Sequence, residues 1–285
     1  MTKSPSDPYR IDLPAVVSFS GGRTSGYMLY HILQAYGGQP DGLRVCFQNT
    51  GLEHAKTYEF IKACADNWSV NIEWLEYRVD ADGNHAFELV DFDTASRQGE
   101  PFTTLIDKKG YLPNPVSRIC TSNLKMRTLD RYLKTLPEFA EGYTNAVGLR
   151  ADEPRRVHRI KSDNGREEMC CPLYHANVTH EDVVAWWSKQ PFDLELPLGG
   201  NMAGNCVGCF LKGKEKLELL MKAMPEYFDW WIEAETEIGK RATTGGRFRS
   251  DRPSYEVMKR VLDQQGWLFD VTGEEEDTIP CMCTD

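Results

Sequence analysis

Two cysteines in a glycine-rich segment are the residues best placed to do chemistry. Cys206 and Cys209 form a Cys-x-x-Cys pair in the stretch GNCVGC, a spacing that lets two thiolates face one metal ion. Cys120, which lies upstream in an expected loop before a helix, is a third candidate ligand. The chain has nine cysteines, and an odd number without a secretory signal favours metal or redox chemistry over a disulfide framework.

The spacing does not determine a fourth metal ligand. We assign this position to Cys283 in the terminal stretch IPCMCTD. Cys281 is the alternative, and either of the two could instead act as a mobile sulfur carrier or nucleophile. The adjacent Cys170 and Cys171 are weaker candidates that we expect to be structural. The spacing alone does not separate zinc from an iron–sulfur cluster.

A second group of polar residues follows the first expected strand, residues 15–20 (AVVSFS). In this segment, glycines let the main chain approach a phosphate closely, and hydroxyl and guanidinium groups can donate hydrogen bonds to it. The N-terminus of the next helix also favours a bound anion. The candidate phosphate-binding residues are Ser18, Ser20, Gly21, Gly22, Arg23, Thr24 and Ser25. The pattern is neither the Walker loop nor the dinucleotide fingerprint, and an ordinary glycine turn is the alternative interpretation.

The elements around these residues alternate between strand and helix. Buried or alternating apolar runs predict strands at 15–20, 43–48, about 72–74 and 143–149. Helical spacing predicts helices at 25–36, 57–65, a segment containing Leu124 to Leu133 capped near Thr121 or Ser122, 179–189, 225–237 and 254–265. This order predicts an α/β fold with a parallel sheet that ends near residue 149. We expect an extension over 1–14, a nucleotide-binding domain over 15–212 and a helical portion over 213–285.

The motifs, taken in order, resemble the PP-loop ATP pyrophosphatases, also called the adenine nucleotide α-hydrolase-like superfamily. Within that superfamily they are most similar to the phosphoadenosine phosphosulfate reductases. The matching segments are SFSGGRTS (18–25), NTGLE (49–53), RIC with a later lysine (118–125), VGLRADE (147–153), PL before a tryptophan-containing helix (172–186) and GNCVGC (204–209). An ordered series over residues 15–212 is much more specific than any one motif.

The resemblance implies a Rossmann-like (HUP, PP-loop) sheet flanked by helices that binds ATP or a related adenine nucleotide with Mg²⁺. The nucleotide would contact the first loop together with Asn49, Thr50, Gly51 and Gly148. It implies Ser20, Arg23, Ser25 and Arg150 as catalytic residues. It also implies that Cys120, Cys206, Cys209 and Cys283 hold a [4Fe-4S] cluster, with zinc as the chemical alternative.

Three positions depart from the reductase pattern. Arg23-Thr24 stands where the family usually has Lys-Asp, Asn49 replaces the usual Asp, and the terminal Glu-Cys-Gly-x-His segment is not present. That segment carries the nucleophilic cysteine of the sulfonucleotide reductases. The departures therefore favour another reaction of the superfamily over sulfonucleotide reduction.

Charge and composition restrict the partners. The formal net charge of −10 disfavours broad nonspecific binding to nucleic acid. Basic residues still gather over 118–127, 150–161 and 240–249, where Phe248 could stack on a base. No run approaches the roughly 20 apolar residues of a membrane span, and the start MTKSPSDPYR lacks a signal's apolar stretch, so we expect a cytoplasmic protein without a membrane partner.

We therefore predict an ATP-dependent enzyme that adenylates an acceptor and transfers sulfur with the help of an iron–sulfur cluster. A reductase of phosphoadenosine phosphosulfate or adenylyl sulfate is the alternative, and a non-catalytic nucleotide-binding regulatory module is the second. The expected partners are an adenine nucleotide and a sulfur donor or thiol carrier. A nucleic-acid acceptor and a homodimer are left open.

Overall fold

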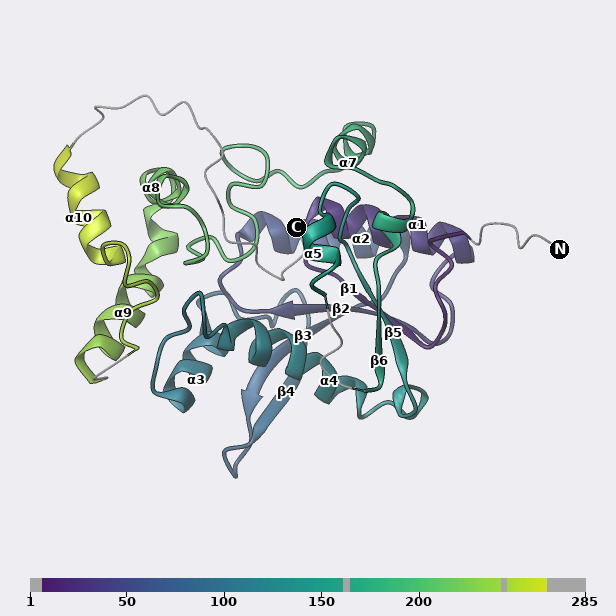
Figure 1. Cartoon of the computed structure of the whole chain (residues 1–285), viewed down its shortest axis with the longest axis horizontal. Coiled ribbons are helices and arrows are strands. Elements are labelled where there is room, and N and C mark those ends of the chain that lie inside the picture. The colour runs from purple at the N-terminus through teal and green to yellow at the C-terminus, as the bar shows by residue number, and fades with distance from the viewer. Residues whose placement is uncertain (1–6, 161–164, 242–244, 266–285) are drawn as a thin grey trace.

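A six-stranded sheet forms the centre of the computed structural model, which describes residues 7–160, 165–241 and 245–265 (Figure 1). The strands are β1 Ala15–Ser18, β2 Leu43–Asn49, β3 Ile72–Val79, β4 His85–Val90, β5 Tyr143–Val147 and β6 Glu167–Cys170. Their order across the sheet is β4-β3-β2-β1-β5-β6. Every pairing is parallel except that of β3 with β4.

The chain changes direction across the sheet at β1. From β1 it runs outward through β2 and β3 on one side, and it returns to build β5 and β6 on the other. Ser18 at the end of β1 pairs with Cys46 of β2 and with Val147 of β5. In open parallel sheets, ligands bind outside the carboxyl ends of strands at such a switch point. This topology confirms the predicted Rossmann-like fold class.

Helices cover both faces of the sheet because successive strand side chains point to opposite faces. Ala15 and Val17 belong to the core on the face of α1 (Arg23–Tyr36), whereas Val16 packs with Leu129 and Leu133 of α4 (Thr128–Leu133). The helices of the sheet region are α1 Arg23–Tyr36, α2 Ala55–Trp68, α3 Glu100–Lys109, the π-helix η1 Cys120–Arg127, α4 Thr128–Leu133, η2 Pro137–Phe139, α5 Pro154–Val157, α6 Pro172–His175 and α7 His180–Trp187. In Figure 1, α1, α2 and α7 lie above β1 and β2, and α4 lies below them.

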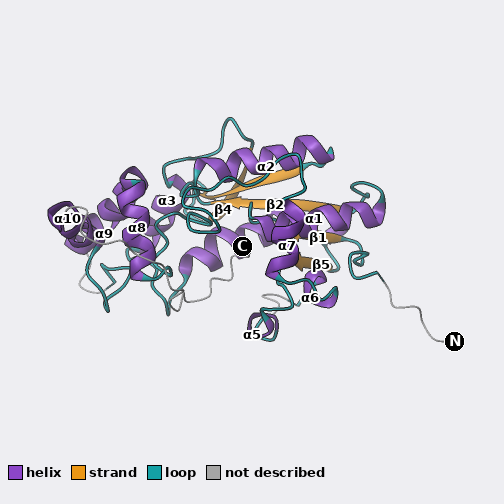
Figure 2. Cartoon of the chain, turned by 90° about the horizontal axis from the view of Figure 1, so that it is seen from above, coloured by secondary structure: helices purple, strands orange, loops and turns teal. Residues whose placement is uncertain are grey.

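The remaining helices lie together at one end of the molecule (Figures 1 and 2). They are α8 Lys214–Ala223, η3 Pro225–Phe228, α9 Asp229–Arg241 and α10 Tyr255–Gln265. The buried aromatic residues Phe228, Trp231 and Tyr255 of these helices, and Phe248 between α9 and α10, are continuous with the main core. None of the helices in the described ranges is long and apolar enough to cross a membrane.

Two features of the fold differ from the sequence-based expectation. The sheet does not end at β5, because β6 pairs with β5 and forms one edge of the sheet. The opposite edge is formed by β4, an antiparallel strand that was not predicted. The helix near residue 121 is not capped there, because the π-helical backbone runs from Cys120 without a side-chain cap and passes directly into α4. A π-helix is rare and often lies at a functional site. The predicted cap of the helix after Thr179 is present as a complete capping box with Asp182.

Candidate functional site

The loop after β1 leads into the N-terminus of α1 and leaves its first turn open. Gly22 is the N-cap, and no side chain caps this end of the helix in the described structure. Gly21 has φ +77°, and a Cβ there would lie 2.7 Å from Cγ2 of Thr57. Thr57 is buried, and its hydroxyl has no hydrogen-bond partner among the described residues. Main-chain amides at a helix start bind anions such as phosphate.

The two predicted serines of this loop are bonded to each other. Ser25 donates its hydroxyl proton to the carbonyl of Gly22 at 3.0 Å and accepts the main-chain N–H of Ser20 at 3.3 Å. The hydroxyls of Ser20 and Ser25 are 2.9 Å apart. Since a hydroxyl has one proton, Ser20 is the donor in that pair. The loop is therefore ordered by its own side chains before any ligand binds.

Arg150 faces the loop from the end of β5. Its Nη1 donates to Oγ1 of Thr24 at 3.0 Å, while its Nε donates to Asp152 at 3.0 Å. Gly148 lies so close to α1 that a Cβ would be 3.3 Å from Cα of Ser25. The structure thus brings Thr24, Ser25, Gly148 and Arg150 together across the switch point.

Unlike the serines of the loop, Arg23 is bonded to residues outside it. Its guanidinium makes two hydrogen bonds of 2.7 Å to the carboxylate of Asp193 and a third, of 2.9 Å, to the carbonyl of Leu194. Its own carbonyl accepts the indole N–H of Trp187 at 2.8 Å. Arg23 thereby ties the loop to the segment after α7, and its predicted catalytic role stays a prediction.

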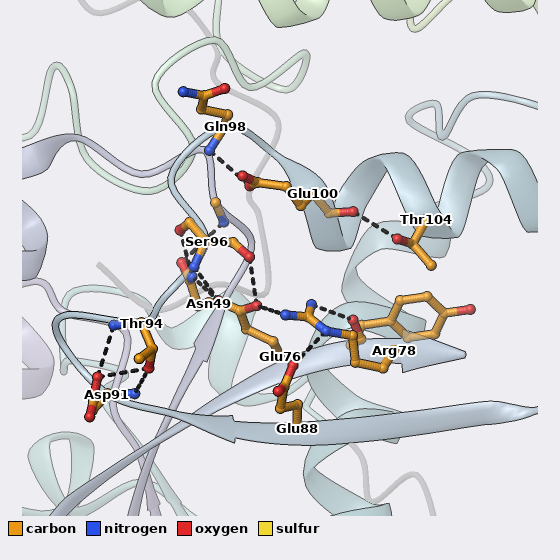
Figure 3. A network of polar contacts seen from close by, with 12 residues as sticks. Asn49, Glu76, Arg78, Glu88, Asp91, Thr94, Ser96, Gln98, Glu100 and Thr104 are labelled. Carbon is orange, nitrogen blue, oxygen red and sulfur yellow. Dashed lines mark hydrogen bonds and ion pairs between the residues drawn. The ribbon is translucent and has the colours of Figure 1, made fainter. Parts of the chain in front are cut away.

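Asn49 is buried in a polar network at the end of β2 (Figure 3). Its Nδ2 donates to Oε1 of Glu76 at 2.6 Å and to the carbonyl of Ser96 at 2.8 Å. Its Oδ1 accepts the N–H of Gly51 at 3.0 Å and the hydroxyl of Tyr58 at 3.1 Å. With all these bonds made inside the protein, the side chain shapes the turn. Its predicted contact with a nucleotide stays a prediction.

The same turn is joined to the Cys-x-x-Cys segment. Glu53 accepts the hydroxyl of Thr50 at 2.8 Å, and Glu53 and Cys206 form an isolated antiparallel bridge. Thr50 Oγ1 lies 3.3 Å from Sγ of Cys206, and the N–H of Val207 donates to the carbonyl of Leu52 at 2.9 Å. The predicted nucleotide-binding turn and one predicted metal ligand are therefore in direct contact.

Cys206 is the buried member of the cysteine pair, and Cys209 is half-buried. The N–H of Cys209 donates to the carbonyl of Cys206 at 3.1 Å, which closes a tight turn. Burial raises the pKa of the Cys206 thiol well above its usual value, and the nearby Glu53 adds to this, while Lys125 and Thr50 act in the opposite direction. In the absence of a metal, Cys206 is therefore a neutral thiol.

The cysteine turn fits two positions of a metal site. The Cys-x-x-Cys spacing and the closed turn suit paired thiolate ligands of zinc or of an iron–sulfur cluster. Within the described ranges, however, no three Cys, His, Asp or Glu side chains lie close enough to hold one metal ion. Cys120, the predicted third ligand, opens η1 and is partly exposed. Cys281 and Cys283 lie outside the described residues.

The other cysteines lie in packed surroundings. Burial raises the pKa of Cys170 and of Cys171 to about 11. It also raises the pKa of Cys46 and of Cys64 well above the usual value. Cys46, Cys64 and Cys171 are buried, and buried thiols pack as small hydrophobic groups and react slowly.

One suggestion about the later basic stretch was wrong. Phe248 is fully buried and stacks on Phe210 with ring centres 5.6 Å apart. It therefore packs in the core and cannot stack on a base. A groove of about 1,080 Å³ does lie nearby, between the turn at Asn114–Val116 and the segment Gly245–Asp251. It is distant in sequence from the loop after β1 and contains none of the predicted site residues.

No family model matches the chain, but comparisons with known proteins find sequence relatives and solved structures that are similar to it. The chain is 32% identical over 213 residues to the uncharacterized nin region protein ORF290 of Escherichia phage lambda, covering 73% of this chain and 69% of that protein. It is 22% identical over 245 residues to the uncharacterized protein MJ0066 of Methanocaldococcus jannaschii, covering 83% of this chain and 44% of the relative's length.

The solved structures are similar to this chain at lower identity. A phosphoadenylyl-sulfate reductase from Candida auris, in a phosphate complex, aligns with a TM-score of 0.41 and 15% identity over 66% of this chain and 81% of its own. The U34-tRNA thiolase NcsA from Methanococcus maripaludis, with its [4Fe-4S] cluster, aligns with a TM-score of 0.40 and 14% identity over 97% and 84%.

Proposed function

The chain belongs to the family of the phage lambda nin region protein ORF290, and we propose that it is an enzyme that uses ATP to activate an acceptor for sulfur transfer. The observation that carries the proposal is the open N-terminus of α1 at the switch point between β1 and β5. An adenine nucleotide would place its phosphates there, between the loop Ser20–Ser25 and Arg150.

Three features support phosphate binding at this position. The helix start offers main-chain amides and the positive end of a 14-residue helix. Arg150 adds a positive charge on the other side of the proposed phosphate position, facing the loop, and it already donates to Thr24 of that loop. The hydroxyl of Thr57, buried beneath Gly21, is without a partner among the described residues, as expected beside a site that a ligand completes.

The reaction we propose is attack by an acceptor oxygen on the α-phosphorus with release of pyrophosphate. The amides of the loop and the guanidinium of Arg150 would stabilise the negative charge that develops on the α-phosphate. Bound Mg²⁺ would supply neutralisation of the leaving pyrophosphate. The loop needs little rearrangement, because Ser20 and Ser25 are already fixed by their mutual hydrogen bond.

The sulfur half of the proposal depends on the cysteine turn. Cys206 and Cys209 would hold the metal centre, with Cys120 and Cys283 as the further predicted ligands. An iron–sulfur cluster there would supply the sulfur species that displaces AMP from the activated acceptor. The contact between Thr50 and Cys206 places this turn next to the end of β2. An acceptor activated at the loop would thus be close to the cysteines.

Titration of the full chain with Mg²⁺ and ATP tests the proposal. We expect saturable binding that Arg150→Gln weakens about 10- to 100-fold, because a hydrogen bond to a charged group contributes about 1.5–3 kcal/mol. Arg155→Gln is the matched control, since Arg155 is an exposed arginine only five residues away. ³¹P NMR of the products should show AMP or an adenylated acceptor with pyrophosphate. Equal ATP affinity in the two variants, or release of ADP and phosphate, would contradict the proposal.

A further inference from the structure

A buried lysine lies directly behind the cysteine turn. Lys212 is 6% exposed and follows Cys209 by three residues. Its Nζ donates to the carbonyl of Gly204 at 2.8 Å and to those of Cys206 and Val207, each at 2.9 Å. An ammonium group has three N–H donors, so it can bond all three carbonyl oxygens at once.

The next carbonyl of the turn is held in the same way from α10. The hydroxyl of Tyr255 donates to the carbonyl of Gly208 at 2.6 Å. Tyr255 is fixed in turn by its main-chain N–H, which donates to the buried Glu235 at 2.8 Å. Arg252 donates to the carbonyl of Lys212 at 2.9 Å. The helices α9 and α10 therefore reach the turn through a continuous buried network.

The turn also has no room to move toward these helices. A Cβ at Gly208 would lie 2.4 Å from Nε1 of Trp231, a residue that is 1% exposed. On its other side the turn is bonded to Leu52 and to Thr50. Cys206 and Cys209 are thus clamped between the turn after β2 and the C-terminal helices.

Burying an ammonium group costs free energy unless hydrogen bonds to its N–H groups compensate for the lost water. Here three carbonyl oxygens, those of residues 204, 206 and 207, accept from the ammonium group, and Tyr255 donates to the carbonyl of Gly208. The lysine also adds a positive charge beside a turn whose thiolates are negative when they bind a metal. Groups that orient metal ligands in this way typically change metal affinity about 10- to 100-fold when they are removed.

We propose that Lys212, together with Tyr255, is the positioning residue that holds Cys206 and Cys209 in the geometry for metal binding. The inference deepens the proposed function and rests on its premise that this pair binds a metal. It assigns the C-terminal helices a role in the site, since their buried network forms the back wall of the cysteine turn.

Anaerobic titration of the full chain with Co²⁺ tests this directly, because thiolate-to-cobalt bands report both affinity and geometry. Lys212→Met should weaken Co²⁺ binding about 10- to 100-fold and shift the ligand-field bands. Tyr255→Phe removes one hydroxyl only and should produce a smaller change in the same direction. Lys216→Met is the matched control, since Lys216 donates to the carbonyl of Asn201 at 3.1 Å, outside the turn 204–209, and the substitution should leave affinity and spectrum unchanged.

Cys206→Ala and Cys209→Ala separate the two levels of the proposal. If the wild-type bands persist in these variants, the metal is not held by the pair, and both the sulfur half of the proposed function and this inference fail. If the cysteine variants lose the bands while Lys212→Met and Tyr255→Phe keep affinity and spectrum, only the inference fails. A lower melting temperature of Lys212→Met with unchanged Co²⁺ binding would overturn it in the same way. Should Lys212→Met not fold, Tyr255→Phe decides.

Discussion

Replacing Asn49 by aspartate tests whether the buried network at the end of β2 requires an amide. Nδ2 of Asn49 lies 2.6 Å from Oε1 of Glu76, whose side chain is fully buried. In Asn49→Asp, an oxygen would replace this nitrogen, so two carboxylates would meet at hydrogen-bond distance with no proton between them. The carbonyl of Ser96 would also lose the donor that now lies 2.8 Å away.

The expected cost of Asn49→Asp is about 3–5 kcal/mol in the free energy of unfolding at pH 7, the range for an uncompensated buried charge. Arg78 and Ser96 still donate to Glu76 in this variant, so the carboxylate of Glu76 keeps part of its stabilisation and the cost should not exceed this range. Lowering the pH should recover part of the loss, because a proton shared by the two carboxyls restores a donor between them. Asn49→Ala, which removes the donor without adding charge, should cost about 1–3 kcal/mol and show no such recovery.

Urea unfolding followed by circular dichroism at pH 7 and pH 5 measures these differences. Asn71→Asp is the control, since Asn71 is exposed and a surface substitution should change stability by less than about 0.5 kcal/mol. An Asn49→Asp protein as stable as the control at both pH values would refute the reasoning.

Two further predictions concern the cysteine turn and pH. Gly208→Ala should lower stability by about 1–3 kcal/mol through overpacking against Trp231, whereas Gly165→Ala, with no atom within 4 Å of its Cβ, should not. Equal urea midpoints would contradict this. Burial, reinforced by Arg131 and Lys108, lowers the pKa of His85 from 6.5 to about 4. As the pH falls, the unfolded chain therefore protonates His85 before the folded protein does. The folded state keeps its full stability with respect to this group above pH 6.5 and loses stability as the pH falls toward 4. His85→Gln should flatten that part of the profile, and an unchanged slope would count against it.

The sequence was sufficient to predict the central elements of the sheet. The run AVVSFS and the helical spacing of Met28, Leu29, Ile32 and Leu33 identify β1 and α1, and all four of these helix residues are buried. The capping pair Thr179 and Asp182 marked the start of α7. Local signals of this kind determine elements because the pattern and the cap lie within a few residues of each other.

The edge strands could not be predicted from local patterns. β6 is the four-residue stretch EEMC, which is half-exposed and carries two glutamates, so it lacks the apolar run of an inner strand. β4 contains no buried residue and pairs antiparallel to β3. Their positions are fixed by pairing with neighbouring strands, which a single segment does not reveal.

The long-range contacts of the site were equally hidden. Asp193, the partner of Arg23, lies 170 residues away, and Thr50 lies 156 residues from Cys206. The sequence identified each residue type and its local motif, but the fold decided that Arg23 forms an ion pair and that Asn49 supports Glu76. Lys212 was overlooked because a lysine after Cys-x-x-Cys looks like a surface residue.

Hydrogen–deuterium exchange of the full chain, with and without Mg²⁺ and ATP, tests the central claim most directly. The account predicts slower exchange of main-chain amides in peptides covering residues 20–26 and 148–150, because the phosphates would bind the open N-terminus of α1 opposite Arg150. Unchanged exchange in both peptides, or protection confined to the groove between Asn114–Val116 and Gly245–Asp251, would contradict it.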